Sequence, residues 1–168
     1  MTVAISCNLS EGVILGVDSA VTVPAGNHYK IWEHAEKLFQ MGERPIGAAI
    51  YGLAGLGDRS IGSYFREFQE RNPDAVLTAR NDVADVVEAV RSFMYGAYQA
   101  TVVPAIQASG RDFNAELQAG TAPGLGIIVG GFSTGQYVPE LWHMLIPYHQ
   151  NPNSAQVRLN RGEIGVTW

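Results

Sequence analysis

Cysteine is nearly absent from this chain, since Cys7 is the single one among its 168 residues. One cysteine cannot form an internal disulfide, which agrees with a reducing compartment and excludes a disulfide-stabilised scaffold. The N-terminus also lacks the basic start and apolar core of a signal peptide. We therefore expect a cytoplasmic protein, and we interpret Cys7 as a small strand residue and not as a nucleophile.

Long hydrophobic runs are missing as well. The most apolar stretch, residues 125–132, is much shorter than the roughly 20 residues that a membrane-spanning helix needs, so we expect no membrane partner. Hydrophobic residues make up 46% of the chain and charged residues 16%. A chain of this length and composition can bury one core, which predicts a single domain over residues 1–168.

Positive charge and metal-ligand spacings are scarce. The net charge is −5 without a cluster of Lys and Arg, so we expect no nucleic-acid partner. The histidines at positions 28, 34, 143 and 149 have no metal-ligand spacing with cysteines or carboxylates. The glycine-rich segment 52–57 lacks the Lys-Ser/Thr of a phosphate loop. These absences predict neither a metal site nor a nucleotide cofactor.

The N-terminal third of the chain has the pattern of β-strands. Residues 2–18 alternate and favour a hairpin around a turn at 8–12. A looser stretch with Pro24, Gly26 and Asn27 follows, and two further strands are expected at 37–41 and 46–53. Four strands are thus predicted before the first helix.

Helices are expected next. Asp58 can cap a helix that ends at Asn72, and a longer helix is expected from about 79–82 until Pro104 stops or kinks it. A polar, glycine-rich connection at 110–124 leads to a strand pair at 125–132 and 136–145. This order predicts an α+β fold in which helices cover largely antiparallel sheets.

Thr2 is the first residue with chemical potential. Removal of Met1 would leave it with a free α-amine, and such an amine titrates near pH 8, so a neutral fraction can accept the proton of the adjacent hydroxyl. One residue would then supply both nucleophile and base. By its position alone, Thr2 reads simply as the residue after a start codon.

Asp18 and Lys37 could complete such a site. Asp18 ends the second strand, where the hairpin returns to the N-terminus, and its carboxylate can orient a cation. Lys37 begins the third strand, and its ammonium would favour a nearby alkoxide and lower the pKa of a nearby amine. Taken singly, both residues read as turn and surface positions.

Four ordered segments together resemble a known family. They are Thr2-Val3-Ala4-Ile5, the run Gly12–Ser19 followed by Val21-Thr22, Lys37-Leu38-Phe39-Gln40, and Gly47–Leu53. They are similar to the opening of mature proteasome β-subunits, which are N-terminal-nucleophile hydrolases. Segment 125–147 resembles the family more weakly, through Ile127-Ile128-Val129-Gly130-Gly131.

The resemblance implies a four-layer αββα sandwich and a peptide-cleaving threonine site without metal or organic cofactor. It implies Thr2 as nucleophile and base, Lys37 as electrostatic activator, Asp18 as the partner of Lys37, and Gly52 as oxyanion donor. By the same resemblance the substrate cleft is lined by Val21, Thr22, Ile50 and Ala54. The implied partners are a polypeptide or peptide substrate and further copies in a homo-oligomeric ring, while a regulatory ATPase stays open.

The C-terminal end departs from the family pattern. The chain stops at Trp168, before the strands, the helices and the supporting Ser and Asp residues that family members carry further on. We therefore expect a C-terminally incomplete domain without its second helical layer. Uncovered strands should then expose apolar residues, for example Ile127, Val129, Leu141 and Leu145.

Other functions remain open at this point. The same fold could serve as a non-catalytic ring subunit, or as a transpeptidase that uses the same acyl-enzyme. A third interpretation is an unrelated α+β binding module in which Thr2, Asp18 and Lys37 have no chemical role.

Overall fold

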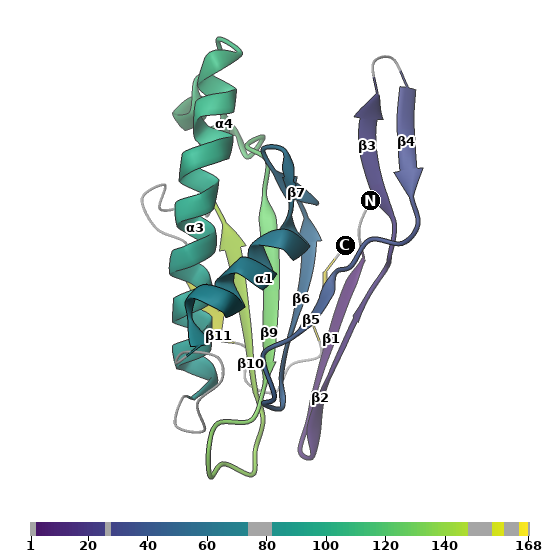
Figure 1. Cartoon of the computed structure of the whole chain (residues 1–168), viewed down its shortest axis with the longest axis vertical. Helices are drawn as coiled ribbons and strands as arrows, with labels where there is room; N and C mark the ends of the chain where they lie inside the picture. Colours follow the sequence, from purple (N-terminus) through teal and green to yellow (C-terminus); the bar gives the residue numbers. More distant parts are fainter. Residues whose placement is uncertain (1–2, 26–27, 74–81, 148–155, 160–164, 168) are drawn as a thin grey trace.

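The computed structural model describes residues 3–25, 28–73, 82–147, 156–159 and 165–167. Within this part of the chain, antiparallel sheets combine with three helices, which confirms the expected mixed α+β class (Figure 1). No helix in the described part is both long and apolar enough to cross a bilayer.

The larger sheet has five antiparallel strands in the order β11-β10-β9-β6-β5. Their bounds are β5 Leu38–Gln40, β6 Ile46–Gly52, β9 Leu125–Gly131, β10 Glu140–Ile146 and β11 Gln156–Leu159. Every residue of β9 is buried. A strand that is apolar on both faces must be covered on both faces, so this sheet lies in the middle of the molecule.

The smaller sheet has the order β12-β1-β2, with β1 at Ala4–Leu9, β2 at Gly12–Val17 and β12 at Gly165–Thr167. It packs on one face of the larger sheet. The contact between the two sheets is an apolar cluster around the buried residues Ala4, Ala49, Ile128 and Leu141. The predicted N-terminal hairpin is thereby confirmed.

The helices cover the opposite face of the larger sheet, as Figure 1 shows. They are α1 Ile61–Arg71, α3 Val83–Ala108 and α4 Phe113–Ala119. The main core lies in this layer, where Phe65 of α1 stacks on Phe39 at 4.3 Å. Each fully buried apolar side chain of this kind contributes about 1.5–3 kcal/mol.

Two expectations about the helices, an N-cap and a connection, are wrong, and Pro104 does not stop the long helix. The N-cap of α1 is Ser60, not Asp58, and its hydroxyl accepts a hydrogen bond from Ser63 N. Pro104 lies inside α3, which continues to Ala108. The segment 110–124, expected as a connection, contains α4, which is too short to show a clear helical period.

The segment expected as a loose connection is also different. It forms a hairpin of β3 (Val21–Ala25) and β4 (His28–Trp32), which pair only with each other in the described chain. This hairpin projects from the rest of the molecule in Figure 1. Two short strands, β7 (Gly55–Leu56) and β8 (Arg59–Ser60), follow β6.

The apolar residues expected to be exposed on the later strands are mostly buried. Ile127, Val129 and Leu141 are at most 3% exposed and Leu145 is partly buried, because helices and the smaller sheet cover both faces. Apolar exposure occurs instead on the outer face of the smaller sheet, at Ile5 (46%) and Ile14 (58%). No described element covers these two side chains.

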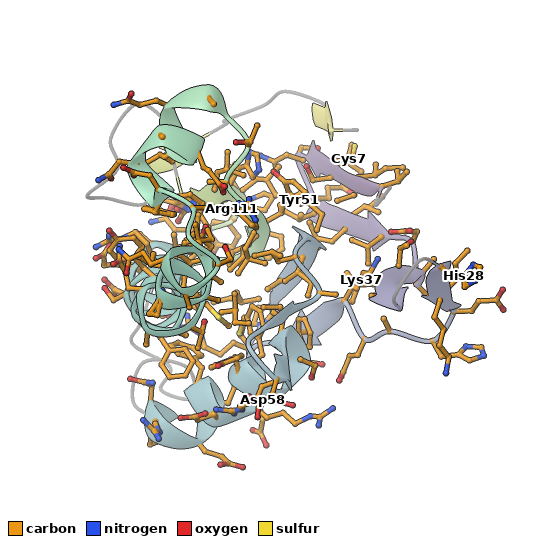
Figure 2. The ribbon with its side chains drawn as sticks, turned by 90° about the horizontal axis from the view of Figure 1, so that it is seen from above. Cys7, His28, Lys37, Tyr51, Asp58 and Arg111 are labelled. Atoms are coloured by element: carbon orange, nitrogen blue, oxygen red, sulfur yellow. The ribbon has the colours of Figure 1, made fainter. Side chains whose placement is uncertain are left out.

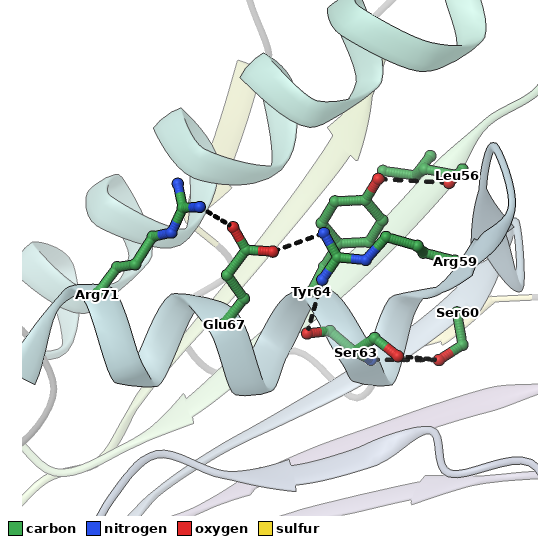
Figure 3. Close-up of polar contacts among 7 residues, drawn as sticks. All are labelled: Leu56, Arg59, Ser60, Ser63, Tyr64, Glu67 and Arg71. Atoms are coloured by element: carbon green, nitrogen blue, oxygen red, sulfur yellow. Dashed lines mark hydrogen bonds and ion pairs between the residues drawn. The ribbon is translucent and has the colours of Figure 1, made fainter.

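Polar contacts join β8 to α1 (Figure 3). Arg59 lies over the ring of Tyr64, 4.3 Å from its centroid, and forms an ion pair with Glu67 at 2.6 Å. Glu67 also binds Arg71 at 2.7 Å. The hydrogen bond to Glu67 raises the pKa of Arg59, so this guanidinium stays charged. The segment that follows β6 is thus fixed to the helix layer.

Candidate active site

A buried lysine lies where the two sheets and the β3–β4 hairpin meet. The side chain of Lys37 (Figure 2), directly before β5, is 5% exposed. Its Nζ lies 3.1 Å from Oδ1 of Asp18. The same Nζ donates to the carbonyl oxygen of Ala20. Burial of an ammonium is unfavourable unless it is paired, and these two acceptors provide the pairing.

Asp18 is held by the N-terminal hairpin. The register Ala4↔Val17 brings the end of β2 back to the start of β1. Asp18 N donates to the carbonyl oxygen of Val3 at 3.1 Å, and Val3 N donates to Oδ1 of Asp18 at 3.2 Å. One carboxylate oxygen therefore binds both the backbone beside the N-terminus and the buried ammonium.

Lys37 is fixed from the other side by the larger sheet. Its carbonyl oxygen accepts a hydrogen bond from Ile50 N at 3.0 Å. The next residue, Leu38, pairs with Ala49 in the β5–β6 register. Two sheets thus position the two ends of the ion pair, since Asp18 directly follows β2 of the smaller sheet and Lys37 directly precedes β5 of the larger.

A cleft of about 1300 Å³ opens beside this ion pair. Residues from the β3–β4 hairpin form part of its lining, and the end of β6, the turn at Gly57-Asp58 and α1 form another part. The lining includes Lys37, Gly52 and all four residues named for the substrate cleft, namely Val21, Thr22, Ile50 and Ala54. Its volume exceeds that of an ordinary ligand pocket and suits an extended ligand.

Gly52 ends β6 in a conformation that favours glycine, with φ = +82°. A Cβ built on it would lie 2.3 Å from the carbonyl oxygen of Gly124. The same carbonyl accepts a hydrogen bond from Leu53 N at 2.9 Å. Positive φ and the close approach both require glycine here.

Thr2, the proposed nucleophile, lies outside the described residues, as does Met1. The other predicted residues lie together, since Lys37 and Gly52 line one cleft and Asp18 binds Lys37. No group of three or more His, Cys, Asp or Glu that could hold a metal occurs in the part of the chain described.

Sequence reasoning missed the side chain next to Gly52. The hydroxyl of Tyr51 forms a hydrogen bond with Nε2 of His143 on β10, and the two rings lie 5.6 Å apart between centroids. It also missed Gly124 and Gly126, which lie where β9 meets the end of β6. A glycine inside a strand pattern indicates close approach of another group, so Gly126 was the available signal.

The arrangement is suited to stabilising negative charge near the N-terminal strand. A buried ammonium acts more strongly than an exposed one because the surrounding dielectric is low. Gly52 places a backbone amide on the wall of the same cleft. The fold and site therefore define a mixed α+β protein with a large cleft beside a lysine–aspartate pair. The sequence matches no protein-family model and no curated protein with which it was compared.

Proposed function

We propose that the protein is a threonine-type peptidase or amidase of the proteasome-like N-terminal-nucleophile group, with Thr2 as its nucleophile once Met1 is removed. One observation carries this proposal. The Asp18 carboxylate binds both the buried Lys37 and the backbone N of Val3, the residue that follows Thr2 in the chain.

The proposed reaction passes through an acyl-enzyme. The neutral α-amine of Thr2 accepts the proton of its own hydroxyl while Oγ bonds to the scissile carbonyl carbon. The tetrahedral oxyanion then collapses, the C–N bond breaks, and the leaving amine takes up the proton. Water attacks the ester with the amine again as base, which releases the carboxylic acid and regenerates Thr2.

Lys37 supports this chemistry through its remaining hydrogen-bonding capacity. An ammonium has three N–H donors, and in the described chain two of them are used, by Asp18 and Ala20. The third can bind Oγ of Thr2 and stabilise it as it becomes an alkoxide. Asp18 keeps the ammonium in place, so no reorganisation is needed when charge develops.

Gly52 provides the second electrostatic element of the proposal. Its backbone N–H would bind the oxyanion of the tetrahedral intermediate. A preorganised donor of this kind contributes roughly 3–4 kcal/mol to stabilisation of the transition state. The rigid position of Gly52 against Gly124 agrees with such a role, because an oxyanion donor must not move during the reaction.

The finer fold assignment also belongs to this proposal. One helix layer and two packed sheets are compatible with three layers of an αββα sandwich, and the exposed Ile5 and Ile14 agree with a missing cover on the smaller sheet. We include in the proposal a cytoplasmic location, polypeptide or peptide substrates, and assembly with further copies of the chain.

A labelling experiment tests the proposed nucleophile. The purified chain is incubated with a peptide epoxyketone, which bonds to both the hydroxyl and the α-amine of one residue, and the modified residue is mapped by mass spectrometry. We expect removal of Met1 and a single adduct on Thr2. The matched control is Thr22→Ala, because Thr22 also lines the cleft, and this variant should still be labelled. Retention of Met1, or labelling elsewhere, would contradict the proposal.

A further inference from the structure

The ring of Tyr51 lies over Gly126, a residue of β9 that has no side chain. Tyr51 on β6 pairs with Gly126 on β9. A Cβ built on Gly126 would lie between 2.0 and 2.5 Å from three atoms of the Tyr51 ring. The ring therefore occupies the space that any other residue at position 126 would fill.

The ring extends across β9 to the next strand. His143 on β10 pairs with Ile128 of β9, and its Nε2 is hydrogen-bonded to the hydroxyl of Tyr51. Either the hydroxyl donates to Nε2, or Nε2–H donates to the hydroxyl oxygen, according to the tautomer. Tyr51, labelled in Figure 2, thus links β6 to β10 across the one strand between them, β9.

The link lies between the two sheets, where movement is restricted. Tyr51 packs against the buried cluster that includes Ala4 and Leu141. Burial raises the pKa of Tyr51, so its hydroxyl stays protonated through the neutral range. The hydrogen bond to His143 is part-buried, which makes it less exposed to competition from water.

Tyr51 and Gly52 share one peptide unit. The carbonyl of Tyr51 and the N–H of Gly52 belong to the same plane, so a rotation of one moves the other. The carbonyl of Gly124 restricts movement of the peptide unit at Gly52. The contact of the Tyr51 ring with Gly126 restricts its movement at Tyr51. The Gly52 N–H can be turned only by the two torsions that flank this peptide unit, ψ of Tyr51 and φ of Gly52. Packing therefore restrains both torsions.

We propose that Tyr51, held over Gly126 by His143, is a positioning residue for the Gly52 N–H in hydrolysis. The inference rests on the proposed function, because it assigns Gly52 as the oxyanion donor. Such a donor acts on charge that exists only in the transition state, so its misplacement lowers kcat and leaves KM unchanged.

The test compares two tyrosines that each lose only a hydroxyl. Tyr51→Phe keeps the ring over Gly126 and removes the link to His143. The matched control is Tyr64→Phe, which removes a buried hydroxyl that donates to the carbonyl of Leu56 and does not line the cleft. With a fluorogenic peptide, we expect Tyr51→Phe to lower kcat about tenfold with KM within twofold, and Tyr64→Phe to match the native kcat.

Two inhibitors distinguish a misplaced oxyanion donor from a general loss of the structure of the site. A peptide aldehyde forms a tetrahedral adduct with an oxyanion, whereas a peptide vinyl sulfone adds Thr2 Oγ to a carbon–carbon double bond and forms none. In Tyr51→Phe the aldehyde should bind about tenfold more weakly, while the labelling rate by the vinyl sulfone stays at the native value. His143→Gln, which retains a hydrogen-bonding group, should have a higher kcat than His143→Ala.

The outcomes distinguish this inference from the proposed function. Native kcat in Tyr51→Phe, or equal losses with both inhibitors, would overturn the positioning role alone. An unsubstituted chain that neither hydrolyses the peptide nor reacts with the vinyl sulfone would overturn the proposed function and the positioning role together. Thermal melts of Tyr51→Phe and Tyr64→Phe within about 4 °C of the native melt would show that folding is retained in both.

Discussion

Gly52 and Gly124 approach so closely that a Cβ on Gly52 would lie 2.3 Å from the carbonyl oxygen of Gly124. The contact joins the end of β6 to the residue before β9. Since the same carbonyl also accepts the N–H of Leu53, it cannot retreat without losing a hydrogen bond. The backbone at this wall of the cleft is therefore fixed on both sides.

Gly52→Ala should destabilise the protein and abolish turnover. Positive φ costs a non-glycine residue about 1–2 kcal/mol, and the clash with backbone adds about 1–3 kcal/mol. Gly135→Ala is the control for φ alone, because Gly135 has φ = +76° with nothing within 4 Å. Gly16→Ala is the control for added volume in open space. Urea unfolding should rank Gly52→Ala as the least stable of the three, and an equal effect in Gly135→Ala would mean that the clash is relieved.

Lys37→Ala should reduce turnover about 10³-fold by removing the ammonium that is proposed to stabilise the Thr2 alkoxide. Its effect on the free energy of unfolding should be about 1–3 kcal/mol, because the remaining Asp18 carboxylate is 28% exposed and stays partly solvated. The control is Arg71→Ala, which removes an exposed guanidinium from its pair with the half-buried Glu67 and should change stability by less than about 1 kcal/mol. Steady-state kinetics and urea unfolding measure both effects. Unchanged turnover would remove Lys37 from the mechanism.

Two substitutions at Thr2 separate the hydroxyl from the amine. Thr2→Ala should abolish turnover, because the nucleophilic oxygen is gone while the amine remains. Thr2→Ser should keep measurable activity, since hydroxyl and amine are both present. Intact mass must confirm that Met1 is removed in both variants. Equal loss of activity in the two would argue against Oγ as the nucleophile.

The buried hydroxyl of Tyr98 should make the protein lose stability in alkali. This hydroxyl donates to the carbonyl of Pro123 at 2.7 Å, and burial together with the negative charge of Glu116 raises its pKa above the ordinary value of 10.0. The folded state thus holds this proton more tightly than the unfolded chain does. The resulting contribution to stability is complete below pH 10 and is lost as the pH rises above 10.

Urea unfolding between pH 8 and pH 11 tests this dependence. Above pH 10 the native protein should lose stability more steeply than Tyr98→Phe, by up to ~1.4 kcal/mol per pH unit. Below pH 10 the variant should be less stable by about 1–2 kcal/mol because a hydrogen bond is lost. Tyr137→Phe is the control, since Tyr137 is 92% exposed, and its profile should follow the native one. Parallel profiles for all three proteins would exclude a role for Tyr98.

Local patterns predicted the elements whose residues follow one period. The apolar spacing of Ile61, Tyr64, Phe65 and Phe68 indicated α1, and all four are buried. Alternation in residues 2–18 indicated the β1–β2 hairpin. The continuation of α3 past Pro104 could not be predicted locally, because a proline inside a helix removes a backbone hydrogen bond and only tertiary packing can offset that loss. The tertiary contacts of α3 are not visible in its local sequence.

The candidate site was predictable only in part. Asp18 and Lys37 were named from their places at the end of one expected strand and the start of another, and then from their family-like spacing. The structure brings them into an ion pair. Tyr51 and His143 are far apart in the sequence, and no local spacing relates them. Their contact depends on the strand order β6-β9-β10, which is a property of the whole sheet.

The pairing of Gly52 with Leu125 sets an order of events during synthesis and folding. The segment between these two residues includes α1, α3 and α4, so the strands that meet are separated by a long stretch of chain. Non-local strand pairing forms slowly, because the entropy of closing the intervening loop is lost before the contact is gained. While β9 is still inside the ribosome, no Gly124 carbonyl is present to hold Gly52. The nascent chain therefore cannot assemble this wall of the cleft, and any hydrolytic activity waits until β9 has emerged.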